Sequence, residues 1–377
     1  MNYLKKHWIF ERIEMKKLNF LLLQLKTGGG VRVIVELANK AVEHGYDVSI
    51  IYPNIKEDNI SFKIDKRVKL EKIGKSSFKV LNFINFFSYI RRKKDEIIIT
   101  TDPIVSLFTR IFPKKCKKIR FCQVDDYELF DDLRVLKNKV NLYFYKKLTL
   151  SSYKDKGIEY VFNSKVVYEK FLINSKRNDV KLKLIHPSVN NQVFFNQDIR
   201  KKDEINIGIV GRKNPWKGLN EFLKAIELLE SNIKEKIKNI YIISHDDLSK
   251  FKVEGRKNVK IITPKNDIEI ARAYNNCHIF VSASWFEGFG LPPLEAMKCG
   301  CAVITSDSKG VNEFAIDGEN CLMFQPKNIE QLKERLEYLI LNSEKREELQ
   351  KAYLKLKKNF SNEDMYKQME LILIENN

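Results

Sequence analysis

The most informative segment of the sequence is Glu287-Gly-Phe-Gly-Leu-Pro-Pro-Leu-Glu295. An apolar run typical of a strand precedes it, and a helix is predicted to begin near Pro293, because proline is pre-organised for a first helical turn. Gly288 and Gly290 let backbone N–H groups approach a bound group closely, and a helix N-terminus adds partial positive charge. The segment therefore predicts an anion site suited to a diphosphate.

Two carboxylates, Glu287 and Glu295, flank this predicted anion site. A carboxylate only accepts hydrogen bonds, so beside a phosphate it suits vicinal hydroxyls better than the phosphate itself. One is a candidate for holding a sugar and the other for holding a ribose. The alternative is that Glu295 only stabilises the helix N-terminus and that Glu287 is a solvated loop residue. Taken alone, either residue leaves this alternative open.

A second loop, Gly211-Arg-Lys-Asn-Pro-Trp-Lys-Gly218, brings cations to the end of another predicted strand, 205–211. Open α/β sheets bind ligands at the carboxyl ends of their strands. Arg212 offers a planar fork and Lys217 a point charge, and both are candidates for clamping phosphates. The alternative is a pair of surface cations beside a turn.

The pattern around these loops alternates between strands and helices. An apolar run over 18–25 predicts a strand buried on both faces, followed by a turn at Gly28–Gly30, a helix to Gly45 and a strand over 48–52. Further strands are predicted at 97–100, 118–124, 160–162, 240–243, 259–262, 278–282 and 302–305, and further helices at 219–229, 329–359 and 362–375. The fold class is α/β, with two doubly wound, Rossmann-like domains.

The chain of 377 residues is long enough for two cores. We predict an N-terminal extension at 1–14, a first domain at 15–190, a polar linker at 191–204, a second domain at 205–360 and a C-terminal helix at 361–377. No low-complexity segment or internal repeat interrupts this division.

The net charge of +19 is concentrated in the first half of the chain. Residues 1–190 hold 39 Lys and Arg against 21 Asp and Glu, whereas residues 191–377 hold 29 against 28. This asymmetry favours an anionic partner for the first domain: a phosphorylated glycan, a lipid phosphate, an anionic membrane or a nucleic acid. A lysine-prone genome is the alternative, although it would load both halves. Both interpretations stay open.

Three further features bear on location. Residues 78–94 combine Phe and Ile with a basic end, which favours a core-packed helix over a membrane-surface helix. The six cysteines lack paired spacing and lie in apolar runs, as expected of core residues in a reducing compartment. No stretch is apolar enough for a signal sequence or a membrane span. We expect a cytoplasmic protein, with peripheral attachment to the inner face of the plasma membrane left open.

The longest motif, Ser284-Trp-Phe-Glu-Gly-Phe-Gly-Leu-Pro-Pro-Leu-Glu-Ala-Met-Lys-Cys-Gly-Cys-Ala-Val-Ile-Thr-Ser306, continues through Gly310, Glu313 and Asp317-Gly318. It resembles the retaining glycosyltransferases of family 4, in the glycosyl transferases group 1 class. The turn at Gly28–Gly30, the loop 211–218 and the hinge-like segment 185–194 support the resemblance. Together they cover nearly the whole chain from Met15.

The resemblance implies a GT-B fold, in which two Rossmann-like domains face a central cleft and the last helix crosses back to the first domain. The donor, a nucleotide diphosphate sugar, would lie on the second domain and the acceptor on the first. Arg212 and Lys217 would bind the diphosphate, Glu295 the ribose hydroxyls and Glu287 a hydroxyl of the transferred sugar. The remaining donor-binding candidates are Gly29, Gly30, Gly211, Gly288, Phe289, Gly290 and Leu291.

The resemblance also implies a mechanism. In front-face substitution the departing phosphate takes the acceptor proton, so stabilising its charge is the main task, for which Arg212, Lys217 and Glu287 are the catalytic candidates. No metal, cofactor or separate base is expected. The acceptor would be a glycan or a lipid-linked glycan, in the synthesis of cell-surface polysaccharide, lipopolysaccharide or a teichoic acid-type polymer.

The sequence departs from the family pattern at two places, one in the hinge segment and one on the acceptor side. Ser188 and Asn190 stand where the family often shows Gly and Asp. The segment Gln123-Val-Asp-Asp-Tyr-Glu128 stands where many members carry a histidine on the acceptor side. A helix start is favoured over a metal-binding pair for Asp125-Asp126, and Asp126 and Glu128 are acceptor-side candidates.

Two other functions are alternatives for this sequence. A sugar-nucleotide epimerase of the same architecture would share the phosphate clamp but would need acid and base side chains on both faces of the sugar. A basic nucleic-acid-binding protein is disfavoured, because Gly28–Gly30 lacks the G-x-G-x-x-G spacing and no nucleic-acid module is recognisable. We therefore expect no nucleic-acid partner.

Overall fold

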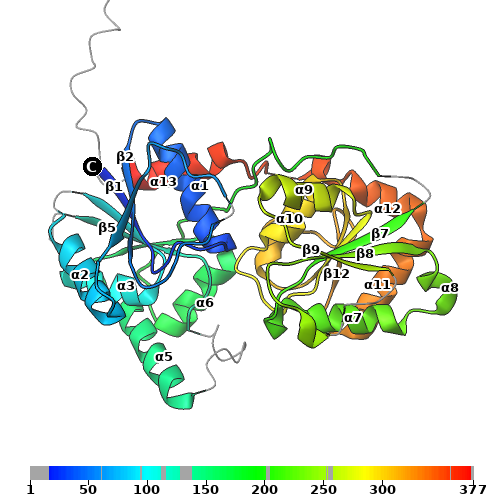
Figure 1. Cartoon of the computed structure of the whole chain (residues 1–377), viewed down its shortest axis with the longest axis horizontal. Helices are drawn as coiled ribbons and strands as arrows, with labels where there is room; N and C mark the ends of the chain where they lie inside the picture. The colour runs from blue at the N-terminus through cyan, green and yellow to red at the C-terminus, as the bar shows by residue number, and fades with distance from the viewer. Residues whose placement is uncertain are drawn as a thin grey trace, which may run out of the picture.

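The computed structural model describes residues 17–60, 62–93, 96–111, 116–127, 138–200, 204–251, 253, 258–356 and 358–374. Two α/β units lie side by side (Figure 1). The extension predicted at 1–14 lies outside the described residues, and the predicted domain boundaries stay predictions.

The first unit is built on a parallel sheet of order β3-β2-β1-β4-β5-β6. Its strands are β1 (Lys17–Leu21), β2 (Asp47–Pro53), β3 (Lys69–Ile73), β4 (Ile97–Thr100), β5 (Lys117–Cys122) and β6 (Glu159–Phe162). Its helices are α1 (Gly29–Glu43), α2 (Lys79–Arg91), α3 (Pro103–Phe108), α5 (Lys139–Tyr153) and α6 (Lys165–Ser175).

The second unit repeats the plan with a parallel sheet of order β12-β11-β10-β7-β8-β9. Its strands are β7 (Ile205–Val210), β8 (Ile237–Ile243), β9 (Val259–Ile262), β10 (Ile279–Ser282), β11 (Ala302–Ser306) and β12 (Leu322–Phe324). Its helices are α7 (Leu219–Leu228), α8 (Ser231–Lys234), α9 (Asp267–Asn275), α10 (Leu291–Lys298), α11 (Ile329–Leu341) and α12 (Ser343–Gln350). The predicted doubly wound α/β class is confirmed.

Helices cover both faces of the first sheet because successive strand residues point to opposite sides. Ile97 and Ile99 of β4 pack into the core beneath α1, whereas Ile98 packs with Phe86 and Ile90 of α2. Strand β6 joins a third cluster with α5 and α6. The layer formed by α2, α3 and α5 is therefore on the opposite face from α1.

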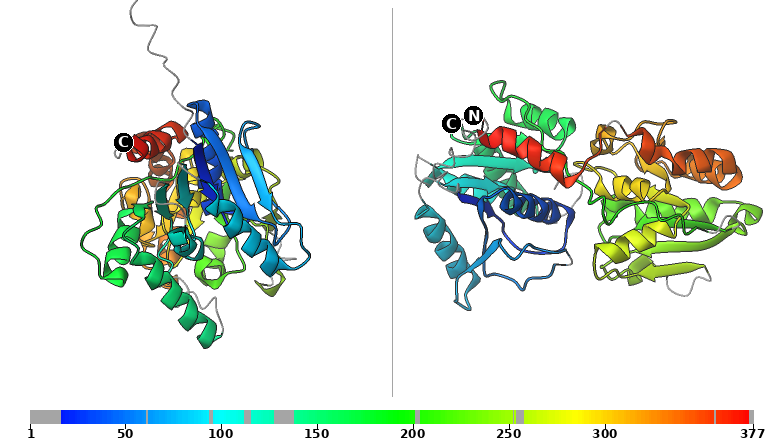
Figure 2. Two further views of the ribbon diagram at one scale, coloured as in Figure 1. Left: turned by 90° about the vertical axis from the view of Figure 1, so that its left-hand side faces the viewer. Right: turned by 90° about the horizontal axis from the view of Figure 1, so that it is seen from above.

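The last helix, α13 (Asn362–Ile374), completes the first core rather than the second. Met365, Tyr366 and Met369 are buried in the cluster that contains α1 and β1. Figure 2 shows this helix returning from the second unit to lie along the first. Lys117 of β5 also donates to the carbonyl of Ile372 near the end of α13.

Two predicted elements differ from the observed ones. The helical stretch predicted over 329–359 is divided into α11, α12 and a 3₁₀ turn at Ala352–Lys355. The division occurs at Asn342, which leaves helical geometry and whose side chain accepts from the N–H of Lys345 at 2.9 Å, which starts α12. The helix predicted over 78–94 is α2, but only Asn82, Phe86 and Ile90 are buried, and much of its apolar surface is exposed.

All six cysteines are buried with free thiols, which confirms their prediction as core residues. No described helix combines the length and the hydropathy that a membrane crossing requires.

Candidate active site

A cavity of about 370 Å³ lies between the two units, where the carboxyl ends of both sheets meet. The glycine turn before α1 and the segment after β5 line it from the first unit. The loops after β7 and β10 and the start of α10 line it from the second. Ligand sites of open α/β sheets occur at this position.

The loop after β10 is built for close backbone approach. Gly290 has φ 94°, a left-handed conformation that favours glycine, and α10 starts at the next residue. A Cβ on Gly288 would lie 2.0 Å from the carbonyl oxygen of Gln123, which belongs to the first unit. The backbone of Gly288 is thus one point of contact between the two units at the cavity wall. The ring of Phe289 packs against His186 and Phe360.

The predicted phosphate-binding and sugar-binding residues are paired with each other. Lys217 Nζ lies 2.6 Å from Glu287 Oε1, and Ser284 Oγ donates to the same oxygen at 2.7 Å. A carboxylate has about four acceptor sites, so Glu287 retains capacity for a ligand hydroxyl. Arg212 also lines the cavity, with its Nε 3.8 Å from Asp246. The solvated-loop alternative for Glu287 is wrong.

Glu295 is buried at the cavity wall, where two side chains hold its carboxylate. Arg32 Nη1 lies 2.7 Å from Oε1, and Tyr274 Oη donates to Oε2 at 3.2 Å. Burial raises the pKa of Glu295, and the charge of Arg32 opposes that rise. Glu295 is not in the first turn of α10, so the helix-stabilising alternative is wrong.

Arg32 was missed by sequence reasoning. It enters the cavity from α1, and its guanidinium bridges two carboxylates of the second unit, Glu295 at 2.7 Å and Asp267 at 3.2 Å. Burial disfavours the charge of Arg32, but Glu295 and Asp267 outweigh burial and raise its pKa. The available signal was its position: a cation in the first turn of a helix opposes the helix dipole and needs a compensating partner.

A second bridge joins the units beside the cavity. Glu313, in the 3₁₀ turn Gly310–Glu313, accepts from the backbone N–H of Lys165 at 2.6 Å and contacts His186 Nε2 at 3.0 Å. Burial works against its charged form, but these hydrogen bonds outweigh burial and lower the pKa of Glu313. Both bridges therefore connect the two units across the cleft.

Not every predicted site residue reaches the cavity. Gly29, Gly30, Gly288, Phe289, Gly290 and Leu291 line it. Gly211 does not, and it is required for packing instead, because a Cβ there would lie 2.5 Å from Ile242 Cγ2. Glu128 lies outside the described residues.

Asp126 also lies apart from the cavity lining. Its carboxylate contacts the buried guanidinium of Arg120 at 2.7 Å, while Asp125 accepts from Tyr153 at 3.2 Å and from Asn174 at 3.1 Å. These contacts assign the pair a structural role inside the first unit. Among the described residues, no three His, Cys, Asp or Glu side chains group in a way that could hold a metal ion.

The two facing α/β units have the GT-B architecture of solved glycosyltransferase structures. The family model for glycosyl transferases group 1 matches residues 190–355, and the chain is a glycosyltransferase of this group 1 type. The uncharacterized glycosyltransferase MJ1069 of Methanocaldococcus jannaschii is 29% identical over 365 residues, which cover 89% of this chain and 91% of the relative.

Two further proteins are similar over nearly their full length. One is the N-acetylgalactosamine-N,N'-diacetylbacillosaminyl-diphospho-undecaprenol 4-alpha-N-acetylgalactosaminyltransferase of Campylobacter jejuni, 24% identical over 356 residues that cover 90% of this chain and 93% of the relative. The other is Anabaena Alr3699/HepE, whose crystal structure was solved in complex with UDP-glucose. Its superposition on this chain has a TM-score of 0.72 at 15% sequence identity and covers 95% of this chain and 99% of that chain.

Proposed function

We propose that the protein transfers a sugar from a nucleotide diphosphate sugar, with retention of configuration and without a metal ion, to an anionic or lipid-linked glycan. The observation that carries the proposal is the buried carboxylate of Glu295, held at the cavity wall by Arg32 and Tyr274 beside the glycine loop and the Lys217–Glu287 pair. A buried acceptor next to an anion site suits the ribose of a nucleotide.

The chemistry follows from the cavity wall. The diphosphate would lie at the start of α10, with Arg212 and Lys217 facing its oxygens. The bond from the anomeric carbon to the phosphate oxygen breaks, and the acceptor oxygen bonds to the same face. The acceptor proton passes to the departing phosphate. The two cations and the helix N-terminus stabilise the charge that develops there, which is the main contribution required of the protein.

Glu287 would orient the sugar. Lys217 and Ser284 fix the position of its Oε1, so its remaining acceptor sites have a defined direction toward the cavity. A fixed acceptor contributes positioning, which converts binding energy into rate. This role is distinct from that of a base, because the phosphate already receives the proton.

Two findings support the acceptor class. The first 190 residues carry most of the net positive charge. The Campylobacter jejuni relative is named for a diphospho-undecaprenol acceptor, and the Anabaena structure contains UDP-glucose. On these grounds we place the reaction at the cytoplasmic face of the membrane, in cell-surface polymer synthesis.

Thermal stabilisation by a panel of nucleotide sugars tests the donor site. A ligand at a hundred times its Kd stabilises the fold by about 2.7 kcal/mol. Lys217→Ala and Glu295→Ala should lose this stabilisation. Lys213→Ala, which removes an exposed lysine of the same loop, should keep it. If all three variants respond equally, the proposed donor site is wrong.

Product analysis tests the reaction itself. The glycosidic product should keep the donor's anomeric configuration, as measured by NMR, and added chelator should leave the rate unchanged. Incubation with donor alone separates transfer from epimerisation, since a transferase gives slow hydrolysis and an epimerase gives a second sugar nucleotide. An interconverted sugar nucleotide would favour the epimerase.

A further inference from the structure

The outer surface of α2 is apolar and unpartnered. Phe78, Val80, Leu81 and Ile84 are between 47% and 71% exposed. The start of the helix is nevertheless fixed, because Asn82 donates to the carbonyls of Asn54 and Ser76 and accepts from the N–H of Ser76. These side chains therefore project from an anchored helix.

A second apolar stripe lies on α5, in the same helix layer. Val140, Tyr143, Phe144 and Leu148 are between 39% and 60% exposed, and their spacing of three or four residues places them on one side of the helix. Phe108, at the end of α3, is stacked on Phe87 of α2 at 4.0 Å between ring centroids. This stacking continues the apolar surface from α2 to α3, which packs against α5.

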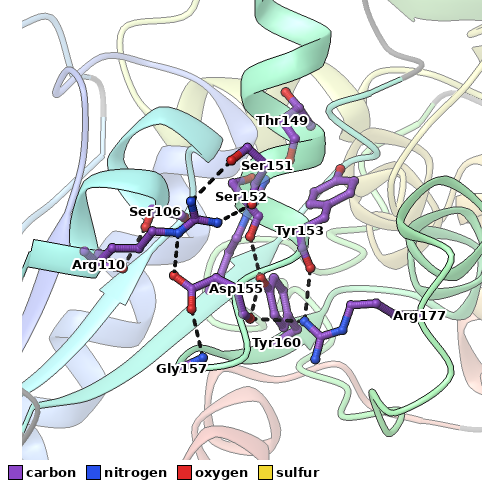
Figure 3. Close-up of polar contacts among 12 residues, drawn as sticks. Ser106, Arg110, Thr149, Ser151, Ser152, Tyr153, Asp155, Gly157, Tyr160 and Arg177 are labelled. Atoms are coloured by element: carbon purple, nitrogen blue, oxygen red, sulfur yellow. Dashed lines mark hydrogen bonds and ion pairs between the residues drawn. The ribbon is translucent and has the colours of Figure 1, made fainter.

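The last turn of α5 is held by three side chains (Figure 3). Arg110 donates to Ser151 and contacts Asp155 at 3.1 Å, while Arg177 donates to the carbonyls of Tyr153 and Asp155 at 3.0 and 3.1 Å. Tyr160 Oη also donates to the carbonyl of Asp155. Helix α5 is thus fixed at its C-terminal end, and the exposed stripe lies toward the end that extends outward in Figure 1.

The charge of this layer has one sign. Within α2, α3 and α5, which the structure describes from end to end, there is no Asp or Glu. Lys79 and Arg91 of α2 and Lys139 and Lys147 of α5 are exposed beside the apolar side chains. Glu71 of the adjacent β3 is already paired with Lys93 at 3.6 Å. Exposed apolar side chains between cations match the interface of an anionic bilayer.

We propose that the α2–α3–α5 layer docks the protein on an anionic lipid bilayer, with the aliphatic and aromatic side chains inserted and the cations at the phosphates. A glycan would gain little from Val80, Leu81, Ile84 or Leu148. A second copy of the chain, paired symmetrically through this layer, would bring the same cations face to face. The docking surface is separate from the donor cavity, so the docking proposal can be wrong while the proposed reaction is right.

Vesicle co-sedimentation tests the surface. The full chain should bind vesicles of phosphatidylglycerol and phosphatidylcholine in equal parts more tightly than phosphatidylcholine alone, and salt should weaken that binding. The double variant L81N/I84N should lower the partition coefficient about tenfold or more. Its matched control, L228N/L341N, replaces leucines of the second unit that are 53% and 59% exposed, and should stay within about twofold of the unmodified chain.

A charge variant, K79Q/K139Q/K147Q, should weaken binding to the anionic vesicles and leave binding to phosphatidylcholine unchanged. This second test gives an answer even if L81N/I84N does not fold. Donor-induced thermal stabilisation of each variant reports separately on the active site. Equal partition coefficients for L81N/I84N and L228N/L341N would overturn the proposal. So would a concentration-dependent dimer in solution that L81N/I84N abolishes, because a second copy would then cover the layer.

Discussion

Gly288→Ala provides a direct test of whether the two units must stay in contact for catalysis. A Cβ at this position would lie 2.0 Å from the carbonyl oxygen of Gln123, whereas carbon and oxygen atoms in contact are about 3.3 Å apart. The obstacle is backbone, so no side chain can rotate away. The φ of Gly288 lies outside the left-handed range that favours glycine, so alanine fits its own backbone conformation. The two units must therefore separate locally by about 1.3 Å.

A displacement of about 1 Å at a reacting centre can lower the rate about a hundredfold, equivalent to about 2.7 kcal/mol of transition-state stabilisation. We expect kcat for sugar transfer to fall by about that factor, with donor stabilisation retained because the proposed donor site lies mainly on the second unit. Gly157→Ala is the control, since Gly157 is not among the cavity-lining residues and a Cβ there meets only the side chain of Asp155, at 3.3 Å. If kcat of Gly288→Ala stays within about threefold of this control, contact at Gly288 is not needed for turnover.

Three further predictions concern the bridges and one helix cap. Arg32→Met leaves Glu295 and Asp267 without their buried cation, which should lower the free energy of unfolding by about 3–5 kcal/mol. A double-mutant cycle with Glu295→Gln should give a coupling energy above about 1 kcal/mol. If the effects of the two substitutions add to within about 0.5 kcal/mol, the bridge does not contribute as described. The pKa of Glu313 is lowered in the folded protein. Its contribution to stability is therefore fully present above its ordinary pKa of 4.5 and is lost as the pH falls through its pKa in the folded state. The difference in Tm between the unmodified chain and Glu313→Gln should therefore shrink below about pH 4.5, and a constant difference from pH 7 to pH 3 would exclude this role. Asn342→Ala removes the cap of α12 and should cost about 1 kcal/mol in urea unfolding, whereas substitution of the exposed Glu344 should have little effect.

Local sequence patterns were sufficient for most of the fold. The apolar runs at Leu18 and Ile97 and the helical spacing after Gly30 correspond to β1, β4 and α1, because strands buried on both faces and helices with one buried side have strong periodicity. Strand β3 was missed because its Lys-Leu-Glu-Lys-Ile sequence is that of a largely exposed edge strand. Strand β12 is only three residues long.

The site was predictable only in part. Gly288 to Glu295 are consecutive along the chain, so their shared role is visible in the sequence. Arg32 and Glu295 are separated by 263 positions, and no local pattern predicts that pairing. The contact between Lys217 and Glu287 arises in the same way, from two loops that the sheet order brings together. Tertiary contacts also assign Asp126 to the buried Arg120 rather than to the cavity.

The return of α13 to the first unit affects the order of events during synthesis. Met365, Tyr366, Met369, Ile372 and Leu373 of α13 belong to a core whose other buried members are all translated before residue 190. At about 5–20 residues per second, the ribosome needs roughly 10–40 s to travel from β6 to α13. Until α13 is made, the nascent first unit lacks the helix that completes its core, whereas the core clusters of the second unit are complete once Phe360 has been added. The unit made first is therefore the last to be finished, and nascent-chain partners would encounter it in its unfinished form.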